Sequence, residues 1–287
     1  MVVTFSRPDI HARLRAEVAA GRSILMFGAG TGLTARCAEV GGADLIGIYS
    51  TAFQRMQGRP SLFGWLPYGD VNAELLERSR EILPVVRKTP CIAGVGAHDA
   101  RRSLDPFFDE LVAMGFSGVT NEPFVGIYGP AFAGQLEAAG IGFSREVELI
   151  ARASTRDLFT VAWAFDPGEA RRMTEAGADV IGAIVGVTAG GLTGAHGTLG
   201  LEEATRLVQE MCEAAHAVRP DVMIITHGGP FADPGTAAYS VANSDAVGYA
   251  AGSSGERVPT EQAVVAVTRA YKEIRLGPDG PGTGAGT

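Results

Sequence analysis

Residues 115–123, Gly115-Phe116-Ser117-Gly118-Val119-Thr120-Asn121-Glu122-Pro123, decide the fold of this chain. A short apolar run follows a glycine turn and ends at Asn121 and Glu122, and Pro123 then removes the amide that further strand pairing would need. The pattern predicts a buried strand that carries an amide and a carboxylate at its C-terminal end. We therefore expect the chemistry of this protein at the edge of the sheet where the strand ends.

Seven further apolar runs have the same form, because each ends in a polar or glycine-rich segment and is followed by a helical pattern. Parallel strands buried on both faces read as continuous apolar runs, and their alternation with helices predicts a single (β/α)8 TIM barrel, an α/β fold, over residues 1–276. A doubly wound open sheet is the alternative, but it would not need so many similar units. The further strands are expected at residues 24–27, 44–49, 91–95, 159–164, 179–184, 221–226 and 245–250.

Three segments lie outside this repeat. An N-terminal helix begins after Ser6, and the helical spacing of Ile10 and Leu14 gives it an apolar face that we expect on the barrel floor. Residues 50–70 form a connection longer than usual, and ordered connections of this length commonly serve as lids or binding walls. Residues 277–287 are almost all Gly, Pro and Thr and predict a flexible tail.

The composition excludes several classes of protein. With 287 residues and 46% hydrophobic content, the chain can bury a large core. The net charge is −8 and the arginines are scattered, so no nucleic-acid partner is expected. The chain has no run of roughly 18 uncharged apolar residues, so we expect a soluble, cytoplasmic protein with no membrane contact. Cys37, Cys91 and Cys212 lack metal-type spacing and are expected to be reduced thiols.

Four residues that follow predicted strands are candidate catalytic groups: Glu122, His227, Asp99 and His98. Catalytic residues of such barrels lie at the C-terminal ends of strands. Glu122 and Asp99 are also the candidate ligands of a divalent metal ion (Mg, Mn or Zn), and His227 is a candidate acid, base or oxyanion donor. The structural alternatives are an exposed loop carboxylate for Glu122, a helix N-cap for Asp99, and a histidine bonded to a neighbouring strand end for His227.

Two glycine-rich turns at neighbouring strand ends indicate an anionic substrate. Residues 252–255 supply backbone N–H groups and two hydroxyls, and Arg257 adds a fork of donors. The turn Gly28-Ala29-Gly30-Thr31-Gly32 lies beside them, because the first and eighth strands are neighbours in a closed barrel. This turn matches neither a dinucleotide fingerprint nor a P-loop, so no nucleotide cofactor is expected.

Several phrases of the sequence together resemble one known family. They are Gly28-Ala29-Gly30-Thr31-Gly32-Leu33, Arg55-Met56-Gln57-Gly58-Arg59 with Leu66-Pro67-Tyr68-Gly69, Val187-Thr188-Ala189-Gly190-Gly191, His227-Gly228-Gly229-Pro230 and Ser253-Ser254-Gly255-Glu256-Arg257. Over about residues 6–271 the chain resembles the phosphoenolpyruvate hydrolase-like family, also called TIM-barrel signal transduction proteins. The same domain is similar to the C-terminal half of a plant tobamovirus-resistance inhibitor protein. The family is distantly like the phosphoenolpyruvate mutase and isocitrate lyase group, whose members make or break C–C or P–C bonds next to a 2-oxo acid on a magnesium ion.

The resemblance implies a retained anion-binding frame and an altered reactive wall. Compared with the usual family pattern, the chain gains His98 and Glu122 and loses a histidine after the sixth strand. The residues expected to bind the substrate anion are Gly28, Gly30, Thr31, Arg55, Thr188, Ser253, Ser254 and Arg257.

Three functions remain open. The first is an enzyme that cleaves or forms a C–C or P–C bond beside a carbonyl in a small anionic 2-oxo or phosphoenolpyruvate-like compound, through an enolate or tetrahedral intermediate. The second is retro-Claisen hydrolysis of a β-dicarbonyl compound, with His98 and Glu122 activating water. The third is a non-catalytic sensor or interaction domain, favoured if the four candidate catalytic groups do not converge. Barrels of this group often assemble, so a homo-oligomer is expected.

Overall fold

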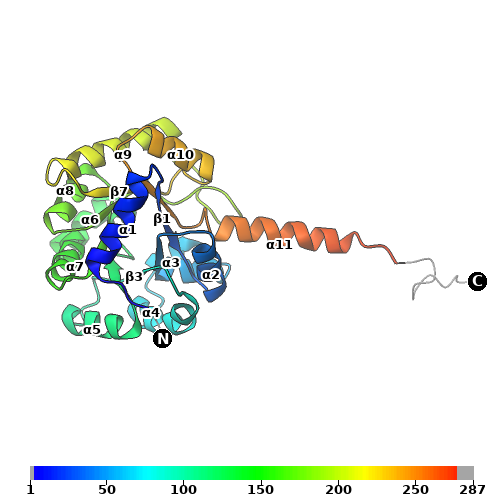
Figure 1. The fold of residues 1–287 in the computed structure, drawn as a ribbon, viewed down its shortest axis with the longest axis horizontal. Coiled ribbons are helices and arrows are strands. Elements are labelled where there is room, and N and C mark those ends of the chain that lie inside the picture. The colour runs from blue at the N-terminus through cyan, green and yellow to red at the C-terminus, as the bar shows by residue number, and fades with distance from the viewer. Residues whose placement is uncertain (1–2, 277–287) are drawn as a thin grey trace, which may run out of the picture.

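The computed structural model describes residues 3–276, which form a closed barrel of eight parallel strands (Figure 1). Each strand pairs with the next in chain order, and β8 pairs with β1 to close the barrel. The predicted α/β TIM barrel is confirmed, and the open sheet is excluded. The strands are β1 (Ile24–Gly28), β2 (Leu45–Ile48), β3 (Cys91–Gly94), β4 (Gly118–Thr120), β5 (Phe159–Ala164), β6 (Val180–Ile184), β7 (Met223–His227) and β8 (Gly248–Ala251).

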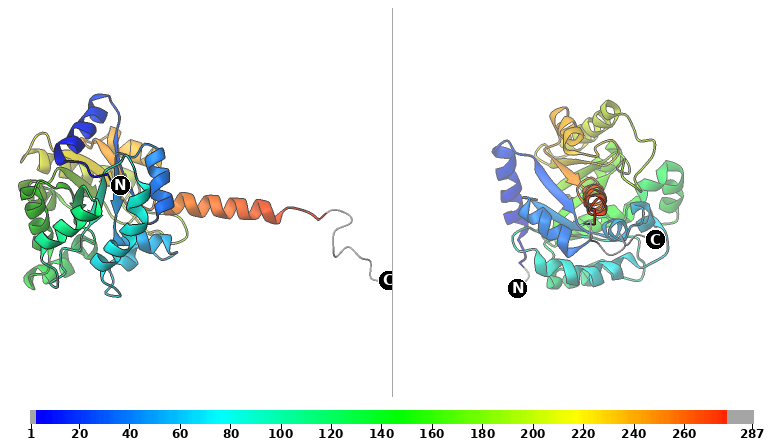
Figure 2. Two further views of the ribbon diagram at one scale, coloured as in Figure 1. Left: turned by 60° about the horizontal axis from the view of Figure 1, so that its bottom comes forward. Right: turned by 90° about the vertical axis from the view of Figure 1, so that its right-hand side faces the viewer.

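Helices surround the barrel, except that the last helix extends away from it (Figure 1; Figure 2, left). The long connection at residues 50–70 contains a helix and a 3-10 turn, so it is ordered. The helices are α1 (Arg7–Ala19), α2 (Gly32–Val40), α3 (Ser50–Met56), η1 (Ser61–Trp65), α4 (Val71–Ile82), η2 (Leu83–Val85), α5 (Leu104–Met114), η3 (Val125–Tyr128), α6 (Gly129–Ala138), α7 (Phe143–Thr155), α8 (Pro167–Glu175), α9 (Leu201–His216), α10 (Pro234–Ala242) and α11 (Arg257–Lys272).

Side chains along each strand alternate between the barrel interior and the surrounding helices. In β5, Phe159, Val161 and Trp163 belong to the interior cluster, whereas Ala162 and Ala164 pack with the outer helices. Trp163 is therefore the last inward-pointing residue of its strand. The same alternation decides which side chains reach the C-terminal end of the barrel.

Helix α1 closes the opposite end of the barrel. Its residues Ile10 and Leu14 are fully buried and belong to the same interior cluster as Ile24 and Phe159. The expected position of this helix on the barrel floor is confirmed. The other end is left for polar side chains from the strand ends.

The stretch that decides the fold ends as a strand earlier than its apolar pattern suggests. Strand β4 stops at Thr120, because the side chain of Asn121 replaces the backbone as hydrogen-bonding partner. Its Oδ1 accepts the backbone N–H of Trp163 at 2.7 Å, and its Nδ2 donates to the carboxylate of Glu146. Asn121 thus ties β4 to β5 and α7 just below the strand ends.

Three further expectations concern membrane spans, the cysteines and the tail. No helix within residues 3–276 is both long and apolar enough to cross a membrane. Cys37, Cys91 and Cys212 are unpaired thiols, of which only Cys37 is exposed. The tail expected at residues 277–287 lies outside the described residues.

Candidate functional site

A small pocket, here called the strand-end pocket, lies at the C-terminal ends of the strands. Its volume is about 40 Å³, and polar groups share its wall with aromatic and aliphatic side chains. Part of the wall comes from η1 in the long connection at residues 50–70, which agrees with the expected binding wall. The lining residues are Tyr49, Thr51, Arg55, Ser61, Trp65, Glu122, Phe124, Ile127, Trp163, Ile184, Gly186, Val187, Thr188, His227, Gly252 and Ser253.

Glu122 is a buried carboxyl group in this pocket. Its side chain accepts a hydrogen bond from the hydroxyl of Thr51. Burial raises the pKa of Glu122 to about 7, although the Thr51 hydrogen bond and the charge of Arg55 both oppose the rise. A carboxyl group with this pKa exchanges a proton near neutral pH, as a general acid or base must.

His227 ends β7 and faces the same pocket. Its Nδ1 lies 2.7 Å from the carbonyl oxygen of Ala250, and because a carbonyl only accepts, Nδ1 carries the hydrogen. Burial lowers the pKa of His227 to about 4, so the imidazole is neutral at pH 7. Its Nε2 then holds a lone pair and accepts a hydrogen bond from a ligand or a water molecule.

Arg55 is the cation of the pocket, and the chain already uses most of its hydrogen-bonding groups. Its Nε donates to Oε2 of Glu256 at 2.5 Å, and its Nη2 donates to the carbonyl of Gly28 at 2.5 Å. Both side chains of this ion pair are almost fully buried. Within residues 3–276 the Nη1 group has no hydrogen-bond partner, so it is available to an anionic ligand in the pocket.

The glycine turn at residues 28–32 holds a carboxylate of the chain itself. Oε1 of Glu256 accepts the N–H of Gly30 at 2.6 Å and the hydroxyl of Thr34 at 2.5 Å. Gly28 has a different role, because a Cβ at this position would lie 1.7 Å from the hydroxyl of Tyr49. We expected this turn to bind an anion of the substrate, and in this structure its Gly30 N–H binds the carboxylate of Glu256.

Two of the other predicted anion-binding residues, Ser253 and Thr188, line the strand-end pocket. Thr31, Ser254 and Arg257 lie outside it, and Thr31 is the N-cap of α2. Ser254 lies on a different surface, where its Oγ is 2.7 Å from the hydroxyl of Tyr249. Arg257 binds the carbonyl of Gly190 at 2.9 Å and the carboxylate of Glu261 at 3.1 Å, and these contacts hold the glycine-rich loop after β6.

Asp99 and His98 do not line the strand-end pocket. Burial opposes ionisation of Asp99, but hydrogen bonds from Arg101, Arg102 and Asn72 hold its pKa well below the usual range. Its carboxylate is therefore already hydrogen-bonded to neighbouring side chains. The Nε2 of His98 lies 3.3 Å from the carbonyl of Gly142 and 3.5 Å from Glu146. Of the four predicted catalytic residues, the structure brings Glu122 and His227 to one pocket. The expected convergence of all four is not observed, and His98 does not lie where it could activate water together with Glu122. A catalytic role therefore rests on Glu122 and His227 alone.

Trp163 was not among the predicted site residues, yet it lines the pocket. Its indole ring packs 5.2 Å from the ring of His227, measured between centroids. Its Nε1–H is buried and makes no hydrogen bond within the described residues. A buried donor without a partner is costly, so this group is a candidate donor to a bound ligand. The alternation of inward and outward side chains along β5 could have identified Trp163 from the sequence as the last inward-pointing residue of the strand.

The pocket does not fit a metal ion held by several acidic or imidazole ligands. Among residues 3–276, no three His, Cys, Asp or Glu side chains converge in a metal-binding arrangement. Of the residues that the structure describes, Glu122 is the sole carboxylate that lines the pocket, and the second predicted ligand, Asp99, is bound to two arginines. The expected Glu122–Asp99 pair is therefore not assembled here.

These observations define a class: a (β/α)8-barrel protein with a buried polar pocket at the C-terminal ends of its strands. Within that class, the chain belongs to the phosphoenolpyruvate hydrolase-like family, whose model matches residues 9–274. The resemblance read from the sequence is confirmed. A similar curated protein is the ToMV resistance protein Tm-1(GCR237) of Solanum lycopersicum, which is 43% identical over 271 residues and 94% of this chain. The chain spans only 36% of the length of that relative.

Solved structures of low sequence identity share the barrel. A phosphonopyruvate hydrolase in complex with oxalate and Mg²⁺ is 19% identical, has a TM-score of 0.56, and aligns over 93% of this chain and 89% of its own. An oxaloacetate acetylhydrolase with the inhibitor 3,3-difluorooxalacetate is 13% identical, has a TM-score of 0.57, and aligns over 92% and 86%. At these identities the likeness establishes the common fold.

Proposed function

We propose that this protein is a hydrolase that splits the C–C bond of a small anionic β-dicarbonyl compound. The observation that carries the proposal is the convergence of Glu122, neutral His227 and the free Nη1 of Arg55 on one pocket. The similar barrels of phosphonopyruvate hydrolase and oxaloacetate acetylhydrolase support reaction at a bond beside a carbonyl group.

In the proposed reaction, water attacks one carbonyl carbon of the substrate while the Glu122 carboxylate removes a proton from the water. Nε2 of His227 accepts a second hydrogen bond and orients the water. The tetrahedral oxyanion is stabilised by donors fixed in advance, the Nε1–H of Trp163 and the hydroxyl of Ser253. Collapse breaks the C–C bond and leaves a carboxylic acid and an enolate, and protonated Glu122 returns its proton to the enolate carbon.

Arg55 is proposed to bind the carboxylate of the substrate. Its Nη1 is free, and the pair with Glu256 fixes the guanidinium so that little order is lost on binding. Within residues 3–276, Arg55 is the sole arginine or lysine that lines the pocket, and Glu256 already balances its charge. A phosphoryl group carries more negative charge than a single carboxylate and normally requires several cations. The pocket thus favours C–C cleavage over P–C cleavage.

The test is turnover of oxaloacetate, a 2,4-dioxo acid and phosphonopyruvate in H₂¹⁸O, with products followed by NMR and mass spectrometry. We expect the dicarbonyl acids to be cleaved and ¹⁸O to enter the released carboxylate. Glu122→Gln should lower kcat/KM by about 10²–10⁴-fold, the usual contribution of a general base. If phosphonopyruvate is the only compound consumed, the reaction is P–C cleavage, and the proposed C–C cleavage is wrong.

Glu169→Gln is the matched control for Glu122→Gln. Burial also raises the pKa of Glu169 to about 7, but this side chain bonds the N–H of Phe165 and does not line the pocket. We expect Glu169→Gln to retain activity. A ligand that stabilises the wild type and Glu122→Gln equally and is never consumed would instead indicate a binding domain without catalysis.

A further inference from the structure

A second cavity, here called the α4 cavity, lies behind the wall of the strand-end pocket. It is bounded by α3, by η1 with the residues that follow it, and by the first two turns of α4. Its volume is about 340 Å³, and sites for small molecules usually measure about 300–1,000 Å³. Among the described residues, none lines both cavities. The α4 cavity is therefore a separate space of a size that suits a small ligand.

Helix α3 separates the two cavities. Its Thr51 and Arg55 line the strand-end pocket, whereas its Ser50 and Gln54 line the α4 cavity. The members of each pair are four residues apart in the sequence, so they share one face of the helix. A ligand in the α4 cavity therefore contacts the helix that carries Arg55.

The turn η1 forms the second part of this wall. Its Ser61 lines the strand-end pocket, and its Phe63 and Gly64 line the α4 cavity. The wall is tightly packed at Gly64, where a Cβ would lie 2.9 Å from Cγ2 of Thr51 and 3.3 Å from Oγ of Ser50. The long connection at residues 50–70 thus has two functional faces, one for each cavity.

Two polar groups of the α4 cavity lack a partner. The Nε–H of Arg78 is buried and makes no hydrogen bond within residues 3–276. The hydroxyl of Ser50, a residue that is 2% exposed, is in the same condition. Buried polar groups normally find a partner, because losing water without gaining a hydrogen bond is costly. Arg78 and Ser50 are therefore candidate donors to a ligand with a negatively charged oxygen.

Glu74 brings the opposite charge to the same cavity. Its carboxylate accepts hydrogen bonds from Nε2 of Gln54, but these are long, at 3.3 and 3.4 Å. Burial raises the pKa of Glu74, although the charge of Arg78 opposes the rise. The two side chains are four residues apart on α4, yet they form no ion pair with each other. Glu74 therefore has room for a positively charged group of a ligand.

Aromatic side chains form the remaining wall of the cavity. The rings of Phe63 and Tyr68 are stacked, with centroids 5.4 Å apart and planes inclined by 21°. Arg59 lies over Phe63, and its Nη1 donates to Oε1 of Gln54 at 3.0 Å. This second arginine is thus already bound within the chain. Tyr68 is 74% exposed, which leaves an aromatic surface open to an apolar group.

We propose that the α4 cavity binds a free α-amino acid with an apolar or aromatic side chain. The carboxylate of the amino acid binds Arg78 and Ser50, and its ammonium group binds Glu74. Its side chain packs against Phe63 and Tyr68. Each group that lacks a partner in the chain thereby gains one. A simple carboxylate would leave Glu74 uncompensated, and a simple amine would leave Arg78 without an acceptor.

The first experiment tests the class of ligand by isothermal titration calorimetry of the full chain at pH 7. L-Phenylalanine is compared with 3-phenylpropanoate, which lacks the ammonium group, and with 2-phenylethylamine, which lacks the carboxylate; L-leucine represents aliphatic side chains. We expect each analogue to bind about 10–100-fold more weakly than L-phenylalanine, because hydrogen bonds to charged groups contribute about this much. Equal affinity for 3-phenylpropanoate would refute the amino acid as ligand. Absence of binding by both amino acids would overturn the proposal.

The second experiment tests the position of the site. Arg78→Gln and Glu74→Gln each remove one charge and should weaken the binding of L-phenylalanine by about 10–100-fold. Arg80→Gln and Glu81→Gln are the matched controls, because both residues lie on exposed positions of α4 and do not line the cavity. The controls should bind L-phenylalanine as the wild type does, and thermal unfolding checks that every variant is folded.

Glu122→Gln distinguishes the α4 cavity from the strand-end pocket. This variant changes the carboxyl group of the pocket and should keep the wild-type affinity for L-phenylalanine. Loss of affinity in Glu122→Gln, together with unchanged affinity in Arg78→Gln and Glu74→Gln, would place the amino acid in the strand-end pocket and overturn the proposal. The titrations measure binding and not turnover, so they test this site independently of the proposed hydrolase activity.

Discussion

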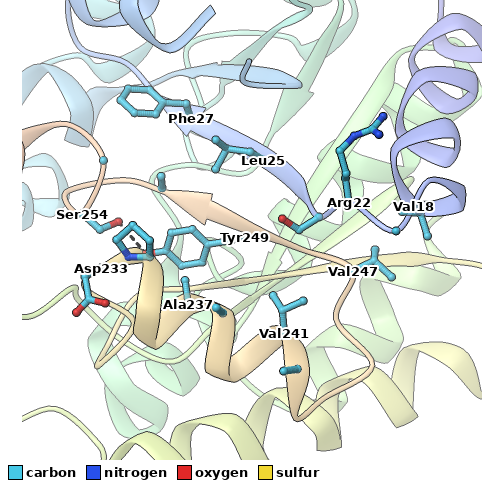
Figure 3. Close-up of a pocket in the computed structure, with 17 residues that line it drawn as sticks. Val18, Arg22, Leu25, Phe27, Asp233, Ala237, Val241, Val247, Tyr249 and Ser254 are labelled. Atoms are coloured by element: carbon cyan, nitrogen blue, oxygen red, sulfur yellow. Dashed lines mark hydrogen bonds between the residues drawn. The ribbon is translucent and has the colours of Figure 1, made fainter. Parts of the chain in front are cut away.

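The strand-end pocket differs in size and chemistry from a groove on the side of the barrel, bounded by β8, β1, α10 and the end of α1 and here called the β8/β1 groove (Figure 3). The pocket has a volume of about 40 Å³ and holds a buried arginine, a carboxyl group and an imidazole, whereas the groove has about 680 Å³ and is mainly apolar. The larger cavity has few groups that could perform a reaction, and the smaller one collects groups with shifted pKa values. Such shifts are typical of functional sites, so chemistry rather than volume identifies the site.

The two regions also differ in how their side chains are held. In the pocket, hydrogen bonds within the chain fix Arg55, Glu256 and the glycine turn, so the guanidinium is positioned before a ligand binds. In the groove, Leu25 and Phe27 are only partly buried, although they belong to a barrel strand. Mutations in the pocket should therefore break contacts that a single chain has already formed.

The largest effect is expected from breaking the buried ion pair of the pocket. Arg55→Met leaves the carboxylate of Glu256 buried without its cation, and such a loss costs about 3–5 kcal/mol of unfolding free energy. Arg55→Met/Glu256→Met removes both charges and should recover much of that loss. Urea unfolding of the three proteins checks this. A double variant as unstable as the single one would contradict the view that the unpaired charge is the cause.

The raised pKa of Glu122 should make the free energy of unfolding depend on pH. The raised pKa, about 7 against a usual 4.5, means that the folded state favours the protonated form. Its stabilisation is fully present below pH 4.5 and is lost as the pH rises through 7. The difference between wild type and Glu122→Gln should change by about 3 kcal/mol over this range. Urea unfolding between pH 4.5 and 8 measures it, and a constant difference would refute the raised pKa.

The barrel could be predicted from the sequence because its signal is repeated and local. Apolar runs followed by helical patterns locate the strands, and for β5 the predicted range 159–164 agrees with the observed one. Strand β4 is shorter than expected because a long-range contact, from Asn121 to Trp163, replaces its ladder. The exit direction of α11 is also nonlocal, since Glu256 and Arg257 fix it through residues far along the chain.

The candidate site was only partly predictable, because strand ends fix positions and not side-chain partners. Glu122 and His227 do reach one pocket, as the barrel geometry suggests. Asp99 also follows a strand, but Arg101 and Arg102 donate hydrogen bonds to its carboxylate and hold it outside the pocket. The turn at residues 28–32 has the amides of an anion site, and nothing local indicates that Glu256 occupies it.

A smaller effect is expected from the glycine that makes room for the pocket wall. Gly28→Ala would place a Cβ 1.7 Å from the hydroxyl of Tyr49 and 2.9 Å from Nη2 of Arg55, so both side chains must move. Such overpacking costs about 1–3 kcal/mol, and substrate binding should weaken with it. Gly134→Ala is the control, since Gly134 lies in α6 with open space around its Cβ position. It should be neutral or slightly stabilising, and equal losses in both variants would contradict the steric argument.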